Sequence, residues 1–254
     1  MKKCVTRQIV VILALIATIA VNGLANALPL NGLTTGEISD RFHVYFVPAG
    51  YVFSIWGLIY LALVAYAIYQ ALPGQRENPR LGSIAELFAL SCVANALWLI
   101  LWHYEVFPLT LAAMLTLLWV LIVIYLRLGI GRVQASTAEK WLVHVPFSIY
   151  LGWITVATIA NATTVLDCLG WNGWGVPQVW AVVMMVAGAG IASAMGLTRG
   201  DVAYMLVIVW AFVGIAVKHA ATPLVSITAW VTAALVVVMI VVSARMYKKP
   251  TEAQ

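Results

Sequence analysis

Charged residues are scarce in this 254-residue chain, where Asp, Glu, Lys and Arg make up 9% of the residues and hydrophobic residues make up 64%. A mean hydropathy of +1.00 leaves too little polar surface to cover a water-soluble domain of this size, so a soluble protein is excluded. The formal net charge is only +5, and nucleic-acid binding is not indicated. The composition predicts an integral membrane protein in contact with the lipid bilayer.

Cysteines and catalytic motifs are also few. Cys4, Cys92 and Cys168 lie far apart and outside any CxxC pattern, which predicts neither a disulfide framework nor a zinc site. The sequence has no GxSxG motif, no dinucleotide loop and no paired carboxylates. Glu86 and Glu105 fall near the ends of apolar runs, so a charge relay of the kind used by ion-coupled transporters is not expected either. These absences argue against an enzyme.

Long apolar runs are what the chain has in abundance. Eight runs are long enough to cross ~30 Å of hydrocarbon, and Pro and Gly mark the joins between them. The sequence therefore predicts an all-α, polytopic membrane helix bundle. The expected helices cover residues 8–29, 49–72, 83–103, 107–127, 141–165, 177–197, 202–218 and 224–246.

Basic residues fall mainly on one side of these spans. With the N-terminus inside, twelve Lys and Arg residues are cytoplasmic, and only Arg41 and Lys218 are outside. This bias predicts that both termini are cytoplasmic in a multi-pass protein, which we expect in the plasma membrane of a prokaryote. The first span also resembles a signal peptide that ends at a small-x-small pattern, Ala25-Asn26-Ala27, and its cleavage would leave seven helices.

Amide and aromatic side chains recur at one depth, in the outer parts of four predicted helices. Helical spacing places them on single faces. The groups are Asn22 with Asn26; Phe53, Trp56 and Tyr60; Asn95, Trp98 and Trp102; and Trp153, Ala157 and Asn161. Large rings with a few polar groups are typical of a small-molecule pocket. Trp and Tyr also gather at membrane interfaces without any ligand, but Trp56, Trp98 and Trp153 lie deeper than that role requires. The polar segment 30–47 is either a lid over this pocket or a plain solvated loop.

Three segments resemble the TspO/MBR family, the tryptophan-rich sensory proteins and translocator proteins. "PAGYVFSIWGLIY" at 48–60 is similar to the start of the second helix of that family, "NALWLILW" at 95–102 to its third, and "YLGWITVATIAN" at 150–161 to its fifth. The resemblance covers residues 8–166. It implies a five-helix TspO-like core at 8–166, followed by a three-helix extension at 167–249.

The resemblance implies a function in binding rather than catalysis. Members bind porphyrins, haem-related tetrapyrroles and sterol-like molecules beneath the loop between the first two helices. This implies a sensor or handler of a hydrophobic small molecule, with porphyrin or haem as ligand and no resident cofactor or metal. The implied ligand-binding residues, together with those from the spacing, are Tyr51, Phe53, Trp56, Tyr60, Asn95, Trp98, Trp102, Trp153, Ala157 and Asn161. A transporter of a hydrophobic metabolite and a structural or partner-binding membrane protein are the alternatives.

Other residues carry weaker expectations. Gly188, Ala192 and Gly196 form a small-residue ridge that predicts close helix packing, either in covering the bundle or in a homo-oligomer. Lys218 ends a span, where it either extends to the headgroups or faces a ligand. The four histidines, His43, His103, His144 and His219, are interpreted as solvated rather than as haem ligands.

Overall fold

The computed structural model describes residues 2–27 and 30–247, apart from the side chains of Lys2, Lys3 and Asn26. Within this part of the chain there are helices and no strands, which confirms the all-α prediction. The long helices are α1 (Lys2–Ala27), α3 (Ile55–Ala71), α4 (Pro79–His103), α5 (Phe107–Leu128), α7 (Val145–Cys168), α8 (Pro177–Arg199), α9 (Val202–Lys218) and α10 (Pro223–Tyr247). The short elements are α2 (Thr35–Asp40), α6 (Thr137–Glu139), a π-helical turn (Lys140–His144) and 3₁₀ turns at Leu30–Gly32, Gly50–Ser54, Pro73–Gln75 and Gly173–Gly175.

Seven helical segments in the described residues are long and apolar enough to span a membrane. The eighth predicted helix, α9, is also present but has only 17 residues. At 1.5 Å per residue it is about 25 Å long, slightly short of the ~30 Å hydrocarbon core. The structure thus contains the eight predicted helices, with seven meeting the length of a full span.

The helix ends follow from local sequence. Asn78 accepts hydrogen bonds from the first backbone N–H groups of α4, and Pro79 occupies a position where a missing N–H costs nothing. Helices α5 and α8 end at Gly129 and Gly200, both at a φ of 65° that glycine tolerates. Asp201 then caps α9 by accepting a hydrogen bond from the backbone N–H of Tyr204. The α8–α9 connection is therefore tight.

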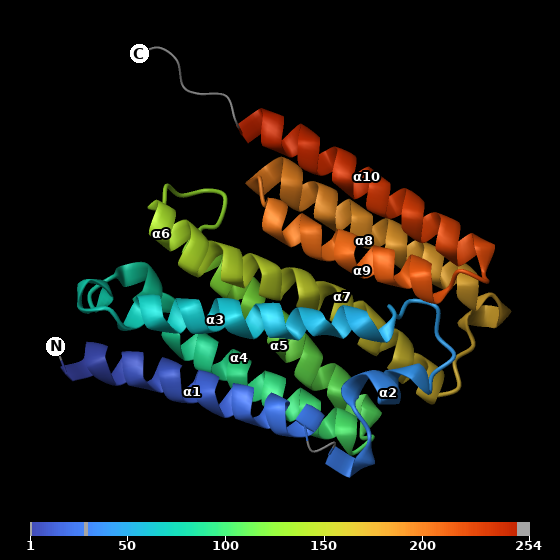
Figure 1. The fold of residues 1–254 in the computed structure, drawn as a ribbon, viewed down its shortest axis with the longest axis horizontal. Helices are drawn as coiled ribbons and strands as arrows, with labels where there is room; N and C mark the ends of the chain where they lie inside the picture. The colour runs from blue at the N-terminus through green and yellow to red at the C-terminus, as the bar shows by residue number, and fades with distance from the viewer. Residues whose placement is uncertain (1, 28–29, 248–254) are drawn as a thin grey trace.

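Helices α1, α3, α4, α5 and α7 form one bundle, and α8, α9 and α10 form a layer beside it (Figure 1). Helix α9 packs on α7 and joins the layer to the bundle. The small-residue ridge of α8 lies inside this layer. A Cβ added at Gly188 or Gly196 would meet Phe212 or Met205 of α9 at 3.1 and 2.5 Å, respectively. The ridge thus packs against α9 within the layer, and a homo-oligomer stays a prediction.

The centre of the bundle has an aromatic level and a polar level. Tyr66, Phe88 and Phe147 meet at ring-centroid distances of 4.9–6.0 Å. Nearer the α2 end, Asn95 accepts a hydrogen bond from Asn22 at 2.8 Å and donates one to the Tyr150 hydroxyl at 3.1 Å. Each amide is buried and paired, as the low polarity of the bundle interior requires.

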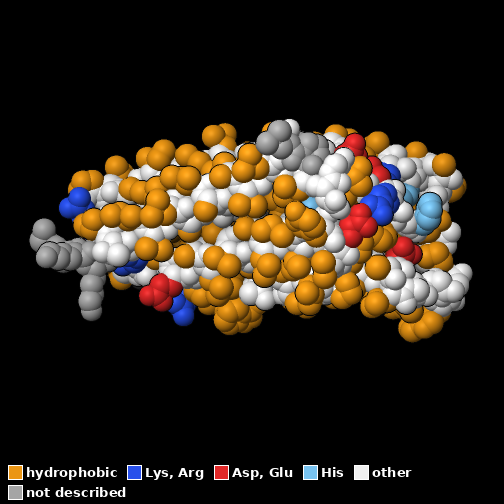
Figure 2. Space-filling view, turned by 90° about the horizontal axis from the view of Figure 1, so that it is seen from below, with side chains coloured by type: hydrophobic (Ala, Val, Ile, Leu, Met, Phe, Trp, Pro, Cys, Tyr) orange, Lys and Arg blue, Asp and Glu red, His pale blue; other side chains and the backbone are white. Residues whose placement is uncertain are grey.

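Charged side chains lie toward the two ends of the molecule, and hydrophobic side chains cover the middle of the face shown in Figure 2. We call the end where α1 begins and α10 ends the basic end, and the opposite end, which carries α2, the lid end. The basic end bears Arg7, Arg76, Arg80, Arg127, Arg132, Lys140, Arg199 and Arg245, whereas Lys248 and Lys249 lie outside the described residues. Arg41 and Lys218 are at the lid end, as predicted for the two outer basic residues.

Candidate functional site

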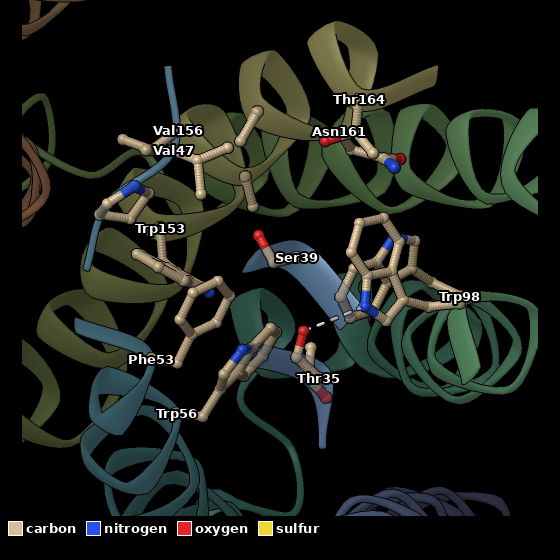
Figure 3. A pocket seen from close by; sticks show the side chains of 14 residues that line it. Thr35, Ser39, Val47, Phe53, Trp56, Trp98, Trp153, Val156, Asn161 and Thr164 are labelled. Atoms are coloured by element: carbon tan, nitrogen blue, oxygen red, sulfur yellow. Dashed lines mark hydrogen bonds between the residues drawn. The ribbon is translucent and has the colours of Figure 1, made fainter. Parts of the chain in front are cut away.

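A cavity of about 40 Å³ lies at the lid end between α2, α3, α4 and α7 (Figure 3). Its lining comes from segments far apart in the sequence. The lining residues are Thr35, Ser39, Val47, Pro48, Phe53, Trp56, Trp98, Trp102, Trp153, Val156, Ala157, Ala160, Asn161 and Thr164. Aromatic rings on three helices thus face a common space, as the spacing of the sequence predicts.

The rings of the cavity hold one another in place. Trp153 of α7 is met edge-on by Phe53 at 5.8 Å and by Trp56 at 6.3 Å, measured between ring centroids. On the opposite wall, Trp98 stacks on Trp102 at 5.5 Å. Offset and edge-to-face contacts of this kind add ~0.5–1.5 kcal/mol each beyond the burial of the rings. The aromatic walls are therefore well ordered around the space.

Three polar atoms at the cavity are buried and have no hydrogen-bond partner among the described residues. They are Nε1 of Trp98, Nε1 of Trp153 and Oδ1 of Asn161. The Asn161 amide nitrogen, in contrast, donates to the Thr110 hydroxyl at 2.8 Å. An unpaired buried polar group costs ~1–3 kcal/mol, so such groups call for an explanation. A bound ligand with its own acceptors and donors would supply one.

The segment 30–47, called the lid below, covers the cavity and is fastened to α4. His103 of α4 is fully buried, and its Nδ1–H donates to the carbonyl oxygen of Leu30 at 3.1 Å. Its Nε2 then accepts from the Thr35 hydroxyl at 3.2 Å. Trp102 donates to the Thr35 carbonyl oxygen at 3.2 Å. The prediction that His103 is solvated is thus wrong, because both ring nitrogens hold the lid.

Arg41 and Glu105 fasten the lid to the end of α4 at the surface. The Arg41 guanidinium contacts both carboxylate oxygens of Glu105 in an ion pair, and this carboxylate raises the pKa of Arg41. Within the lid, Thr34 donates hydrogen bonds from its backbone N–H and hydroxyl to the Glu37 carboxylate and thereby lowers the pKa of Glu37. This capping box fixes the first turn of α2.

Helix α9 of the C-terminal layer holds the other side of the lid. Lys218 forms an ion pair with Asp40, so it neither extends freely to headgroups nor faces the cavity. The neighbouring His219 donates from Nε2 to the carbonyl oxygen of Val47 at 3.3 Å. Burial and, next, the charge of Lys218 lower the pKa of His219, although its hydrogen bond to Val47 opposes this shift. The lid is thus clamped between α4 and α9.

A family model described as "TSPO-like protein" matches residues 8–242. The chain belongs to the TSPO-like family. This confirms the resemblance to TspO/MBR proteins, and the matched region includes α8, α9 and most of α10. No curated protein and no solved structure matches the chain in two further comparisons. The division of this TSPO-like chain into a core at 8–166 and an extension at 167–249 stays a prediction.

Three of the predicted site residues do not line the cavity of this TSPO-like protein. Tyr51 is 48% exposed and lies against Trp210 of α9, with 5.5 Å between ring centroids. Tyr60 stacks beneath Trp56 at 5.5 Å, one helical turn farther from the lid. Asn95 has the structural role in the polar level described above. The other seven, Phe53, Trp56, Trp98, Trp102, Trp153, Ala157 and Asn161, line the cavity.

Two lid residues of this TSPO-like site were not predicted from the sequence. Thr35 and Ser39 of α2 are buried and line the cavity, yet their sequence context is that of a polar loop. The "Thr34-Thr35-Gly36-Glu37" capping-box pattern is the one signal that could have placed a helical turn there. Within residues 2–27 and 30–247, no group of three or more His, Cys, Asp or Glu side chains could hold a metal ion.

Proposed function

We propose that this membrane protein of the TSPO-like family binds a flat, hydrophobic small molecule in the lid-end cavity, with a porphyrin or related tetrapyrrole as the best-fitting class. The observation that carries this proposal is the trio of unpaired buried atoms on aromatic walls: two indole N–H donors, from Trp98 and Trp153, and the amide oxygen of Asn161. A ligand must then offer both acceptors and a donor. Porphyrin carboxylates and pyrrole N–H groups offer both, whereas a sterol offers a single hydroxyl.

The size of the cavity implies that the lid moves when a ligand enters. A volume of about 40 Å³ has room for a few water molecules, at ~10–15 Å³ each, and is far below the ~300–1,000 Å³ of pockets that hold drug-sized ligands. Thr35 and Ser39 of α2 line this small cavity, so a larger molecule needs α2 to move (Figure 3). We therefore infer that the lid is closed in this structure and that it swings away to admit the ligand.

The orientation follows from the basic residues. The basic end carries eight described Lys and Arg side chains, named above, and the lid end carries Arg41 and Lys218. From the positive-inside rule we infer that the basic end is cytoplasmic and that the lid-end cavity is in the outer leaflet. Such a position suits a receptor that samples a hydrophobic molecule from outside the cell.

A binding titration tests the proposal directly. Purified protein in nanodiscs is titrated with protoporphyrin, and binding is followed by porphyrin absorption, so that removal of a tryptophan does not alter the signal. Trp153→Phe keeps an aromatic ring but removes the five-membered ring with its N–H group, and we expect a Kd at least about five-fold weaker, the factor for one lost hydrogen bond of ~1 kcal/mol.

The matched control is Trp119→Phe. Trp119 is 59% exposed on α5, away from the cavity, and its substitution should leave the Kd unchanged. If Trp153→Phe binds as tightly as the wild type, or if Trp119→Phe weakens binding equally, protoporphyrin does not occupy the lid-end cavity and the proposal fails.

A further inference from the structure

A second hollow, a groove of about 1,150 Å³, lies between α3, α7 and α9. Its lining residues are different from those of the lid-end cavity. At its inner limit Trp210 donates from Nε1 to the carbonyl oxygen of Val52 at 3.1 Å, which joins α9 to the start of α3. From Asp201 to Trp210 the wall formed by α9 is ~14 Å long, close to half of a ~30 Å hydrocarbon core. The groove therefore has the depth of one leaflet, the one at the basic end.

The walls of the groove are apolar over most of this depth. Ile55 and Leu58 of α3, Ile149 of α7 and Leu206 of α9 all line it. Leu58 and Leu206 are 51% and 53% exposed, so they remain open to whatever surrounds the protein. In a bilayer these surroundings are hydrocarbon chains. An acyl chain rather than water fills a groove of this kind.

The mouth of the groove, at the basic end, has a different chemistry. Lys140 and Arg199 line it there, together with His144. His144 is only 6% exposed, and its Nε2 has no hydrogen-bond partner among the described residues. Lys140 and His144 begin and end the π-helical turn, an irregularity that occurs frequently at functional sites. Two cations and an unpaired ring nitrogen thus meet at the point where an apolar groove reaches the headgroup region.

One acid also lines the groove, but both of its carboxylate oxygens already accept hydrogen bonds. The Asp201 carboxylate accepts hydrogen bonds from the Tyr125 hydroxyl at 2.8 Å and from the Ser148 hydroxyl at 2.6 Å. Its other oxygen accepts from the Tyr204 backbone N–H at 3.1 Å. Because Asp201 is held by α5, α7 and α9, it stabilises the junction between these helices, and Lys140 and Arg199 set the sign of charge offered to a headgroup.

We propose that this groove binds one anionic phospholipid from the leaflet at the basic end. An acyl chain lies between α3 and α9, and the phosphate lies among Lys140, Arg199 and His144, where His144 supplies a donor in its Nε2–H tautomer. The lipid adds to the contact between the five-helix bundle and the C-terminal layer, which also meet here through α7 and through the hydrogen bond from Tyr125 of α5 to Asp201. The proposal concerns a site separate from the lid-end cavity, so it stands or falls independently of porphyrin binding.

The amount of lipid that the purified protein retains tests whether the groove binds a phospholipid. The full chain is reconstituted with equal amounts of phosphatidylglycerol and phosphatidylcholine of identical acyl chains, extracted in a mild detergent, and the retained lipids are counted by native mass spectrometry. We expect one tightly retained phosphatidylglycerol per wild-type chain. Lys140→Gln should weaken its retention about five-fold, the factor expected for one basic side chain near an anionic headgroup. His144→Phe, which keeps a buried ring, should also weaken it.

Two further variants separate the groove from the general lipid shell. Leu206→Trp places a large ring in the groove from an exposed position and should weaken retention of the bound lipid, with an unchanged thermal unfolding temperature as the check on folding. Arg132→Gln removes an exposed charge at the same end, outside the groove lining, and should change nothing. The proposal is overturned if Arg132→Gln and Lys140→Gln lose the lipid equally, or if Leu206→Trp loses none. It is also overturned if inorganic phosphate displaces the lipid, or if a dimer is found in place of the lipid-bound chain.

Discussion

Replacing His103 with leucine should release the lid. In the closed form the imidazole is fully buried between α4 and the lid, where it donates to the Leu30 carbonyl oxygen and accepts from the Thr35 hydroxyl. Leucine fills most of the same space but can do neither. The closed lid of the variant therefore keeps two buried polar groups without partners, whereas in the open lid both groups reach water.

The size of the effect follows from these two groups. Each orphaned group costs ~1–3 kcal/mol, so the lower limit for the pair is about 2 kcal/mol. At 1.4 kcal/mol per factor of ten, the open population should rise about 30-fold. His103→Asn retains an N–H donor close to the position of Nδ1, and it should give an intermediate value.

The assay is the alkylation rate of a cysteine at Ser39, which is 4% exposed and lines the cavity beneath the lid. The background carries Cys4→Ser and Cys168→Ser, because these two native cysteines are accessible. With a water-soluble maleimide, labelling of Ser39→Cys should be about 30-fold faster in His103→Leu than with His103 intact, by the ratio of open populations. His43→Leu, a change at an exposed position of the lid, is the matched control. An unchanged rate in His103→Leu would refute the role of the imidazole as the fastener of the lid.

Three other outcomes follow from the same structure. Gly214→Val should lower the thermal stability of the protein, because even a Cβ there would lie 2.2 Å from the side chain of Val52 in the turn that leads into α3; Gly190→Val, in open space on α8, is the control, and both are compared by thermal unfolding. Asp201→Ala should lower the unfolding free energy by ~2–5 kcal/mol, because it leaves two buried hydroxyl donors unpaired, and a denaturant titration that shows less than 1 kcal/mol would contradict this. Lid closure should weaken as the pH falls below about 6.5: the pKa of His219 is lowered in the closed form, so the open form takes up the proton first. Above this pH the contribution of His219 to lid closure is fully present and does not change with pH. His219→Gln should abolish the pH dependence of the maleimide rate.

The helical period made the walls of the cavity predictable. Trp98 and Trp102 on α4, and Trp153 and Asn161 on α7, share faces because residues three, four, seven or eight apart lie on one side of an α-helix. Tyr51 does not line the cavity, for a local reason. The chain enters α3 through a 3₁₀ turn at Gly50–Ser54, with three residues per turn instead of 3.6, and this turn directs Tyr51 to α9 rather than to the cavity.

The lid contacts could not be predicted because they join residues far apart in the chain. His103 and Thr35 are separated by 68 positions, and Lys218 and Asp40 by 178. A histidine or lysine at the end of an apolar run has the same local pattern whether it faces solvent or a buried partner. The same is true of Asp201, which reads as an ordinary helix cap in the sequence and in the structure also joins α5, α7 and α9.

If the lid-end cavity binds a ligand as proposed, a lid fastened on both sides has a consequence for the timing of ligand exchange. Entry and exit must use the same opening, so the event that limits uptake also limits escape. When the opening is rare, the observed association rate levels off at high ligand concentration, and a captured molecule stays until the lid next opens. A protein built in this way would average the ligand concentration over time and ignore brief pulses.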